Sequence, residues 1–570
     1  MMRPVFVAAF ALLLAACGKQ ESATETTPVA APAGSEKPAP VTPTVEGRFA
    51  GEIKAEDFAA RLKKLSSDQF EGREPGTIGE RVTTNYIKDQ FERIGLKPGN
   101  NGNWFQTVPM VKTELIDPAS VRIEVTGSTG TQTFGIGADA VLNTLNGSMD
   151  VSIKDSDIVF AGYGVNAPDW NDYDGIDVKG KTVIVLVNDP GWGNKDPELF
   201  KGPALTYYGR WTYKYEEAAR QGAAALFIVH ETPGAGYPWS VVQNGWTGPQ
   251  YALPASEDPA PRLEAAGWLS EEAATRLFAT AGEDFAAMKK SADLRGFKAS
   301  ALGAKLSVDF RSKVETTSSE NVIGVLPGSQ RPDEAIVYTA HWDHFGKDES
   351  LEGDQIFNGA IDNATGVAGI IEIAEAFTHQ ATPPQRSVVF AAVTLEESGL
   401  LGSQYLVAHP PYALDKTVAN INIDALHIDG PTRNVAVLGL GQSELDDYVT
   451  EAAKAQGRVI TGDEEPEKGF FFRSDQLNFV RAGVPALYAS SGLDLVDGGE
   501  AAGRAAHDDY TTNRYHKPGD NFDPDWDYRG VVADLEMLYG VGRKLADETS
   551  FPQWKPGADF ARPADKADKD

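Results

Sequence analysis

Cysteine is almost absent from this sequence: Cys17 is the only one among 570 residues. No disulfide can form within the chain, so cross-links cannot contribute to its stability. Basic residues are also scarce, since 52 lysines and arginines stand against 82 aspartates and glutamates, a formal net charge of −30. Because no basic face stands out to neutralise phosphates, we exclude nucleic acid as a partner and attribute the acidity to a solvated surface.

The N-terminal apolar run, residues 5–16, is too short to span a bilayer, which takes about 20 residues. It follows Arg3 and ends at Cys17, which predicts a signal peptide over residues 1–16. The end of the run resembles a bacterial lipobox, in which the cysteine thiol takes the lipid. Gly18 is not the aspartate of an inner-membrane retention signal. We therefore expect a lipoprotein of the bacterial cell envelope, held in the outer membrane through Cys17.

Two stretches are too polar to build a core. Residues 17–50 are rich in Ala, Pro, Thr and Glu, which predicts a lipid-anchored, disordered linker. Residues 551–570 repeat Pro, Ala, Asp and Lys and predict a disordered tail. The length between them predicts more than one domain, since domains usually hold about 100–200 residues.

Two kinds of segment precede residue 321. Residues 56–95 predict a helix, with a capping box at Thr77-Ile78-Gly79-Glu80 and a stop at Gly95. Residues 157–300 read as a separate unit. Its predicted strands are 158–163, 182–187 and 223–229, and its predicted helix is 213–221.

From residue 321 strands alternate with helices, which is typical of a mainly parallel α/β sheet. The predicted strands are 321–326, 335–340, 387–395, 418–423, 435–438 and 485–488. The predicted fold class is therefore α/β, with a mixed, mostly parallel sheet flanked by helices and a β-rich α+β domain inserted before it.

Polar residues follow these strands at their carboxyl ends, which meet at one edge of such a sheet. His341 follows strand 335–340, Glu396 and Glu397 follow strand 387–395, and Asp424 ends strand 418–423. Asp362 precedes a helix and His516 lies in a loop. Taken singly, each has an ordinary explanation, such as a charged turn or a surface histidine. Taken together, two imidazoles and three carboxylates suit zinc; the candidate ligands are His341, Asp362, Glu397, Asp424 and His516.

The motifs around these residues are specific. They are His341-x-Asp343, Gly359-Ala360-x-Asp362-Asn363, Glu396-Glu397-x-Gly399-Leu400-Leu401-Gly402-Ser403, Asn422-x-Asp424, Arg473-Ser474-Asp475 and Tyr515-His516. Over roughly residues 56–546 the chain resembles the co-catalytic zinc aminopeptidases of the leucyl-aminopeptidase, glutamate-carboxypeptidase and transferrin-receptor family. Residues 157–300 resemble the protease-associated domain that is inserted in many members.

The resemblance implies a division of the chain. It consists of a signal peptide (1–16), a lipid-anchored disordered linker (17–50), the N-terminal part of the peptidase domain (51–145), the protease-associated insertion (146–305), the catalytic zinc peptidase domain (306–550) and a disordered tail (551–570).

The resemblance also implies two Zn²⁺ ions that share Asp362. His341 and Asp424 would complete one ion, and Glu397 and His516 the other, with the ions about 3.5–4 Å apart and sharing a hydroxide.

Further roles follow from the same resemblance. Glu396 would be the general base, and Asp343 would orient His341. Tyr515 would donate to the tetrahedral oxyanion, although a packing role is an equally good interpretation. The peptide bond between Asp362 and Asn363 would be cis.

Five further residues receive weaker interpretations. His344 and His427 are expected at the rim of the site rather than among the ligands, and Asp475 to support it from outside. Arg473, with Arg514, is a candidate for a cationic pocket.

The implied function is that of an exopeptidase that hydrolyses N-terminal residues from peptides through a metal-bridging hydroxide activated by Glu396. Three alternatives stay open. A glutaminyl-peptide cyclotransferase would use one zinc, and a glutamate-carboxypeptidase-like dipeptidase would need the cationic pocket. A zinc-free, receptor-like protein would lack ligands, whereas all five positions are filled here. Residue preference, oligomeric state and the role of the inserted domain stay open.

Overall fold

The computed structural model describes residues 40–45 and 47–562, which belong to one compact unit of the chain, Pro38–Asp570. The predicted signal peptide, Cys17 and most of the predicted linker lie outside the described residues. Among the helices that are described, none combines the length and the apolar character needed to cross a membrane.

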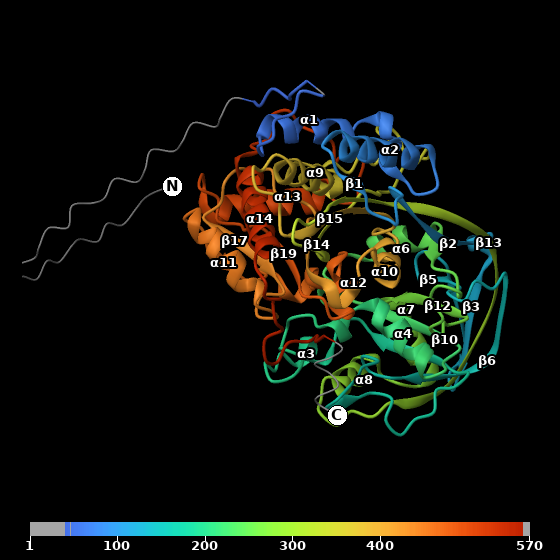
Figure 1. Ribbon diagram of the computed structural model, residues 1–570. Coiled ribbons are helices and arrows are strands. Elements are labelled where there is room, and N and C mark those ends of the chain that lie inside the picture. The colour runs from blue at the N-terminus through green and yellow to red at the C-terminus, as the bar shows by residue number, and fades with distance from the viewer. Residues whose placement is uncertain (1–39, 46, 563–570) are drawn as a thin grey trace, which may run out of the picture. The chain divides into compact units, whose positions relative to one another are not determined.

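A mixed, mostly parallel sheet forms the framework of the C-terminal half of the chain (Figure 1). Its strand order is β13 (Ser300–Leu326), β15 (Arg386–Val393), β14 (Arg331–His341), β16 (Thr417–Asn422), β19 (Ala486–Ser491), β17 (Asn434–Leu438) and β18 (Val459–Thr461). β15, β14, β16 and β19 run parallel, whereas β13 and β17 are antiparallel to their neighbours β15 and β19. The predicted α/β fold is confirmed.

Helices cover both faces of this sheet, because its central strands are apolar on both sides. Every residue of β15 is buried. One face packs against α9 (Thr365–Thr378) and α14 (Arg529–Asp547), which contribute Ile370 and Leu535 to the core. The other face packs against α10 (Leu401–Ala408) and α12 (Gln476–Arg481). Candidate ligands lie at or just beyond the carboxyl ends of β14, β15 and β16.

The inserted segment builds a second sheet. Its order is β4 (Gly130–Gly135), β3 (Arg122–Gly127), the first part of β13, β6 (Asp150–Phe160), β9 (Thr182–Leu186), β10 (Ala225–His230), β12 (Ala265–Ser270) and β5 (Ala140–Asn143). Helices α4 (Trp211–Arg220) and α7 (Glu271–Ala281) follow strands of this sheet. Strands β3 to β5 of this sheet precede residue 146, where the protease-associated insertion is predicted to begin.

β13 links the two sheets as one strand of 27 residues. Its first part pairs with β3 and β6, and its later part pairs with β2 (Phe105–Leu115) and then β15. The boundary predicted at residue 305 therefore cuts through a continuous strand.

The helix predicted over residues 56–95 is three elements: α1 (Ala55–Leu65), η1 (Asp68–Arg73) and α2 (Ile78–Arg93). Thr77 caps α2 by accepting a hydrogen bond from Gly79 N–H, while Glu80 accepts from Gly76 N–H rather than from the cap residue itself. The break has a steric cause at Gly72, which has φ 65°. A Cβ there would lie 2.2 Å from the carbonyl oxygen of Gly346, so only glycine admits this approach.

Both segments predicted to be disordered are partly packed. In the linker, Phe49 lies 4.1 Å from the Arg61 guanidinium and Ala50 N–H donates to Asp57 at 2.6 Å. In the tail, Trp554 Nε1 donates to the carbonyl oxygen of Gly483 at 3.1 Å. Aromatic residues at the ends of these polar stretches supply the contacts.

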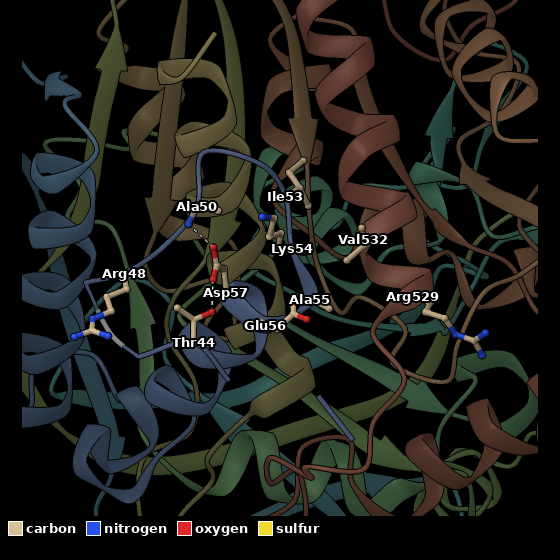
Figure 2. A pocket seen from close by; sticks show the side chains of 10 residues that line it. All are labelled: Thr44, Arg48, Ala50, Ile53, Lys54, Ala55, Glu56, Asp57, Arg529 and Val532. Carbon is tan, nitrogen blue, oxygen red and sulfur yellow. Dashed lines mark hydrogen bonds between the residues drawn. The ribbon is translucent and has the colours of Figure 1, made fainter. Parts of the chain in front are cut away.

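Figure 2 shows an open pocket of about 740 Å³ beside the packed part of the linker. It is lined by Arg529 and Val532 of α14 together with Thr44, Arg48, Ala50, Ile53, Lys54, Ala55, Glu56 and Asp57. None of these residues is a candidate ligand.

Candidate metal centre

The five candidate ligands come from five loops or strand ends. His341 is the last residue of β14, Glu397 follows β15 and Asp424 follows β16. Asp362 lies in η4 (Ala360–Ala364), immediately before α9, and His516 lies beyond α13 (Gly499–Asn513). Parallel neighbouring strands place the first three side chains at one edge of the sheet.

Two histidine donor atoms each lie close to two carboxylate oxygens. His341 Nε2 lies 3.2 Å from Oδ1 of Asp362 and 3.2 Å from Oδ1 of Asp424. His516 Nε2 lies 3.3 Å from Oδ2 of Asp362 and 3.3 Å from Oε2 of Glu397. Bonds of about 2.0–2.1 Å at tetrahedral angles put neighbouring ligand atoms about 3.3 Å apart. Each histidine nitrogen therefore lies at ligand spacing from two carboxylates, and each faces a different oxygen of Asp362.

Glu396 lies beside the ligands. Its Oε2 is 4.0 Å from His341 Nε2, which is longer than the separation between neighbouring ligands of one ion. Burial raises the pKa of Glu396, and the carboxylates of Glu397 and Asp424 raise it further, although His341 opposes them. A carboxyl group with a raised pKa takes up a proton readily, which suits a general base.

Asp343 fixes the turn that carries both glutamates. Its carboxylate accepts hydrogen bonds from Glu396 N–H at 3.2 Å and Glu397 N–H at 3.4 Å. The Nδ1 atom of His341 lies 3.2 Å from the carbonyl oxygen of Asp343 and 3.7 Å from its carboxylate. Asp343 therefore contacts His341, as predicted, but mainly through its backbone.

Asp520 fixes the loop of the bridging residue. Its carboxylate accepts from Ile361 N–H at 3.0 Å and from Asp362 N–H at 3.1 Å. The peptide bond between Asp362 and Asn363 is cis, which confirms that prediction. Asp520 follows His516 by four residues, so it ties the His516 loop to the Asp362 loop.

Arg73 is a cation buried behind the ligand loops, with 1% of its surface exposed. It donates to the carbonyl oxygens of Trp342 and Gly359, each at 2.8 Å, and to that of Asn358. Burial lowers the pKa of Arg73 to about 10, against the opposing effect of Asp362 and other nearby carboxylates. The guanidinium stays charged at neutral pH and offsets part of the negative charge of the site.

The two histidines expected at the rim behave differently. His344 is 2% exposed and its Nδ1 lies 2.6 Å from Oε1 of Glu397, so it is buried beside a candidate ligand rather than at the rim. Its donor atom lies within 4.8 Å of those of Asp362 and Glu397. His427 is half-buried and lies 6.4 Å, ring to ring, from His507.

Two further predicted residues lie close to the ligands. The Tyr515 ring stacks on His516 with centroids 3.8 Å apart and remains 38% exposed. Asp475 is fully buried, and neither of its carboxylate oxygens has a hydrogen-bond partner within the described part of the chain. Burial raises the pKa of Asp475 to about 7.

Sequence reasoning missed Arg73, His344 and Asp520. Arg73 gave no signal, because it is 268 positions before the first ligand and belongs to an unrelated turn. His344 directly follows the His341-x-Asp343 motif, and Asp520 lies in the same short loop as His516. Proximity to a motif was therefore available as a signal for both.

An α/β sheet with imidazole and carboxylate donors gathered at its carboxyl edge defines the class, an α/β protein with a candidate metal centre. Comparison adds a family match. Residues 321–539, less than half of the chain, match the model of Peptidase family M28. The matched region contains all five candidate ligands.

Individual relatives match shorter regions. Aminopeptidase NAALADL1 of Mus musculus is 29% identical over 127 residues, which cover 21% of this chain and 16% of the relative. The glutamate carboxypeptidase 2 homolog of Caenorhabditis elegans is 33% identical over 138 residues, which cover 22% of this chain and 16% of the relative. The match thus spans about a sixth of each relative. The solved aminopeptidase from Aneurinibacillus sp. strain AM-1 aligns over 90% of this chain and 98% of its own, with 19% identity and a TM-score of 0.49.

Replacing the buried guanidinium tests its structural role. Arg73→Met removes a buried charge and leaves several buried carbonyl oxygens unpaired, so we expect the free energy of unfolding to fall by about 3–5 kcal/mol. Denaturant unfolding of the chelator-treated protein measures the change. Arg122→Met, at an exposed arginine of β3, is the control and should change stability by less than about 0.5 kcal/mol. Equal stability of the two variants would contradict the assigned role.

Proposed function

We propose that this chain is a two-zinc exopeptidase that hydrolyses N-terminal residues from peptides. The observation that carries the proposal is the spacing of 3.2–3.3 Å between donor atoms on either side of Asp362. Imidazole nitrogen and carboxylate oxygen are the usual ligands of zinc outside thiolate sites. The match of residues 321–539 to peptidase family M28 and the name of the mouse relative support the exopeptidase assignment.

The residues around the ions have separable tasks. Bound zinc would supply a Lewis acid that polarises the scissile carbonyl. Glu396 takes a proton from the attacking water and delivers it to the leaving amine. Asp343 keeps Glu396 in place through its backbone N–H. Tyr515 is exposed beside His516, so its hydroxyl can donate to the carbonyl oxygen of a bound peptide.

Two alternatives receive less support. A cyclotransferase with one zinc would need one of the two donor groups, whereas both are complete here. A zinc-free, receptor-like protein would gain nothing from donors held at ligand spacing. The donor geometry therefore favours a hydrolase with two ions.

Removing the base separates catalysis from metal binding. Glu396→Ala should keep its zinc, because Glu396 stands outside both donor groups, but kcat should fall by about 10²–10⁴-fold. Elemental analysis and aminoacyl fluorogenic substrates measure the two quantities. Glu92→Ala, on an exposed position of α2, is the control. A zinc-loaded Glu396→Ala protein with the turnover of the wild type would refute the assignment.

One observation favours a second candidate, a dipeptidase or carboxypeptidase that recognises a terminal carboxylate. Among the described residues the side chain of Arg210 forms no hydrogen bond or ion pair, and its Nε is buried. Burial lowers the pKa of Arg210 to about 10, and the nearby guanidinium of Arg473 lowers it further, while Glu396 and Tyr515 are close enough to act on it electrostatically. The Arg473 guanidinium likewise forms no ion pair within this part of the chain, and its hydrogen bond there goes to the carbonyl oxygen of Ala235, at 3.3 Å.

Two guanidinium groups without carboxylate partners suit an anionic group of a substrate. Arg210 comes from the inserted segment and Arg473 from the catalytic part, so both parts would contribute to binding. Arg514, the other candidate for a cationic pocket, is already paired with Asp509 at 3.2 Å.

Blocked substrates distinguish the two candidates. If the arginine pair binds a terminal carboxylate, Arg210→Met and Arg473→Met should each raise KM for a dipeptide about 10–100-fold, because each substitution removes a charge-assisted hydrogen bond to that carboxylate. The corresponding dipeptide amide should be unaffected. Cleavage of an N-acetylated dipeptide would favour the carboxypeptidase, and cleavage of the amide alone would favour the aminopeptidase. Equal effects on dipeptide and amide would contradict carboxylate binding.

We further propose that Cys17 carries a lipid that holds the enzyme at the outer membrane, where it meets peptide substrates. The support is the lipobox-like sequence that ends the apolar run 5–16. Cys17→Ser should move the protein from the outer-membrane fraction to the soluble fraction of a Gram-negative host. An unchanged distribution on cell fractionation would contradict lipidation at this residue.

A further inference from the structure

His344 occupies a position behind the ligands that no role described so far requires. It follows β14 by three residues and is 2% exposed. Its backbone N–H donates to the carbonyl oxygen of Arg73 at 3.2 Å. The residue is thus tied to the same buried turn that supports the loops around Asp362.

The imidazole of His344 contacts one oxygen of Glu397 and leaves the other free. Its Nδ1 lies 2.6 Å from Oε1 of Glu397, while Oε2 of Glu397 lies 3.3 Å from His516 Nε2. The shorter distance is typical of a strong hydrogen bond to a carboxylate and is too short for two ligands of one tetrahedral ion, which lie about 3.3 Å apart. His344 is therefore a hydrogen-bond donor to Glu397 rather than a sixth ligand.

The other ring nitrogen supports this assignment. His344 Nε2 is buried and has no hydrogen-bond partner within the described residues. A buried N–H without an acceptor is costly, so the neutral ring carries its proton on Nδ1, facing Glu397.

The ring is also sterically confined. A Cβ on Gly359, which has φ 49°, would lie 2.6 Å from His344 Cδ2, so this glycine leaves room for the imidazole. The Phe345 ring packs edge-on with its centroid 4.9 Å from that of His344. A confined donor holds its acceptor in one orientation.

We propose that His344 is a positioning residue that sets the zinc affinity of the Glu397 subsite, defined as Glu397, His516 and the nearer oxygen of Asp362. The inference rests on the proposed two-zinc centre. The subsite needs such support because His516 comes from a loop and its side chain is 30% exposed, whereas the His341 side chain of the other position is 1% exposed. Partners that orient metal-binding carboxylates change metal affinity by about 10–100-fold when they are removed.

Zinc titration of the chelator-treated full-length protein, followed by calorimetry, tests the proposal. The wild type should bind two ions. His344→Ala should bind one ion with the wild-type Kd and the second about 10–100-fold more weakly. His344→Asn should restore most of the affinity, since its amide nitrogen is as many bonds from Cα as Nδ1. His344→Gln, whose amide nitrogen corresponds to Nε2, should behave like His344→Ala.

The controls separate this role from a general effect on folding. His409→Ala removes a half-exposed histidine that pairs with Glu257 and should leave both affinities unchanged. If His344→Ala does not fold, the comparison of His344→Asn with His344→Gln decides the question. Wild-type affinities in both His344→Ala and His344→Gln, or equal weakening in His344→Asn and His344→Gln, would overturn the inference alone. A wild type that binds fewer than two ions would overturn the proposed function together with it.

Discussion

Mutual repulsion among carboxylates at the carboxyl edge of the central sheet is the constraint around which the site is built. Seven acidic residues gather there: Asp343, Asp362, Glu396, Glu397, Asp424, Asp475 and Asp520. Their low exposure weakens screening by water, so like charges repel one another more strongly than they would at the surface. Backbone N–H groups stabilise the carboxylates of Asp343 and Asp520, and Arg73 supplies one buried positive charge. Two divalent cations at the 3.2–3.3 Å donor groups would offset most of the remaining negative charge.

The loops that carry the ligands are held in place by residues from distant parts of the chain. Gly72 lets the η1 turn approach Gly346 closely, and this approach brings Arg73 against the carbonyl groups beside Asp362. Asp520 then joins the His516 loop to the Asp362 loop. The N-terminal helices, the sheet and the loop beyond α13 therefore share one function, which is to hold like charges at fixed distances.

The two metal positions are unequal. His341 ends a central strand and its side chain is 1% exposed. The sheet therefore holds the metal position that includes His341 rigidly. His516 has φ 55° and a side chain that is 30% exposed, on a loop. Glu397 is held from behind by His344, which gives the second position a rigid element that its loop histidine lacks. We expect the second ion to exchange more readily than the first.

The sequence predicted the parts of this account that depend on local pattern. Short apolar strands followed directly by His341, Glu397 and Asp424 identified both the parallel sheet and its functional edge. Only the end of β13, residues 321–326, was predicted, because the first part of the strand alternates buried and exposed residues whereas its end is buried on both faces. Arg73 and Arg210 escaped because their roles arise from tertiary contacts between segments far apart in the chain. Phe49 and Trp554 pack against the folded chain although their neighbours in the sequence are polar. The composition of these segments therefore did not predict their contacts.

The central claim is that Asp362 is shared by two zinc ions, and anomalous diffraction tests it most directly. Crystals of the zinc-loaded protein, measured on both sides of the zinc absorption edge, should give two anomalous peaks about 3.5–4 Å apart. One peak should lie among His341, Asp362 and Asp424, and the other among His516, Asp362 and Glu397. A single peak at full occupancy in zinc-saturated crystals, or two peaks that do not share Asp362, would contradict the account.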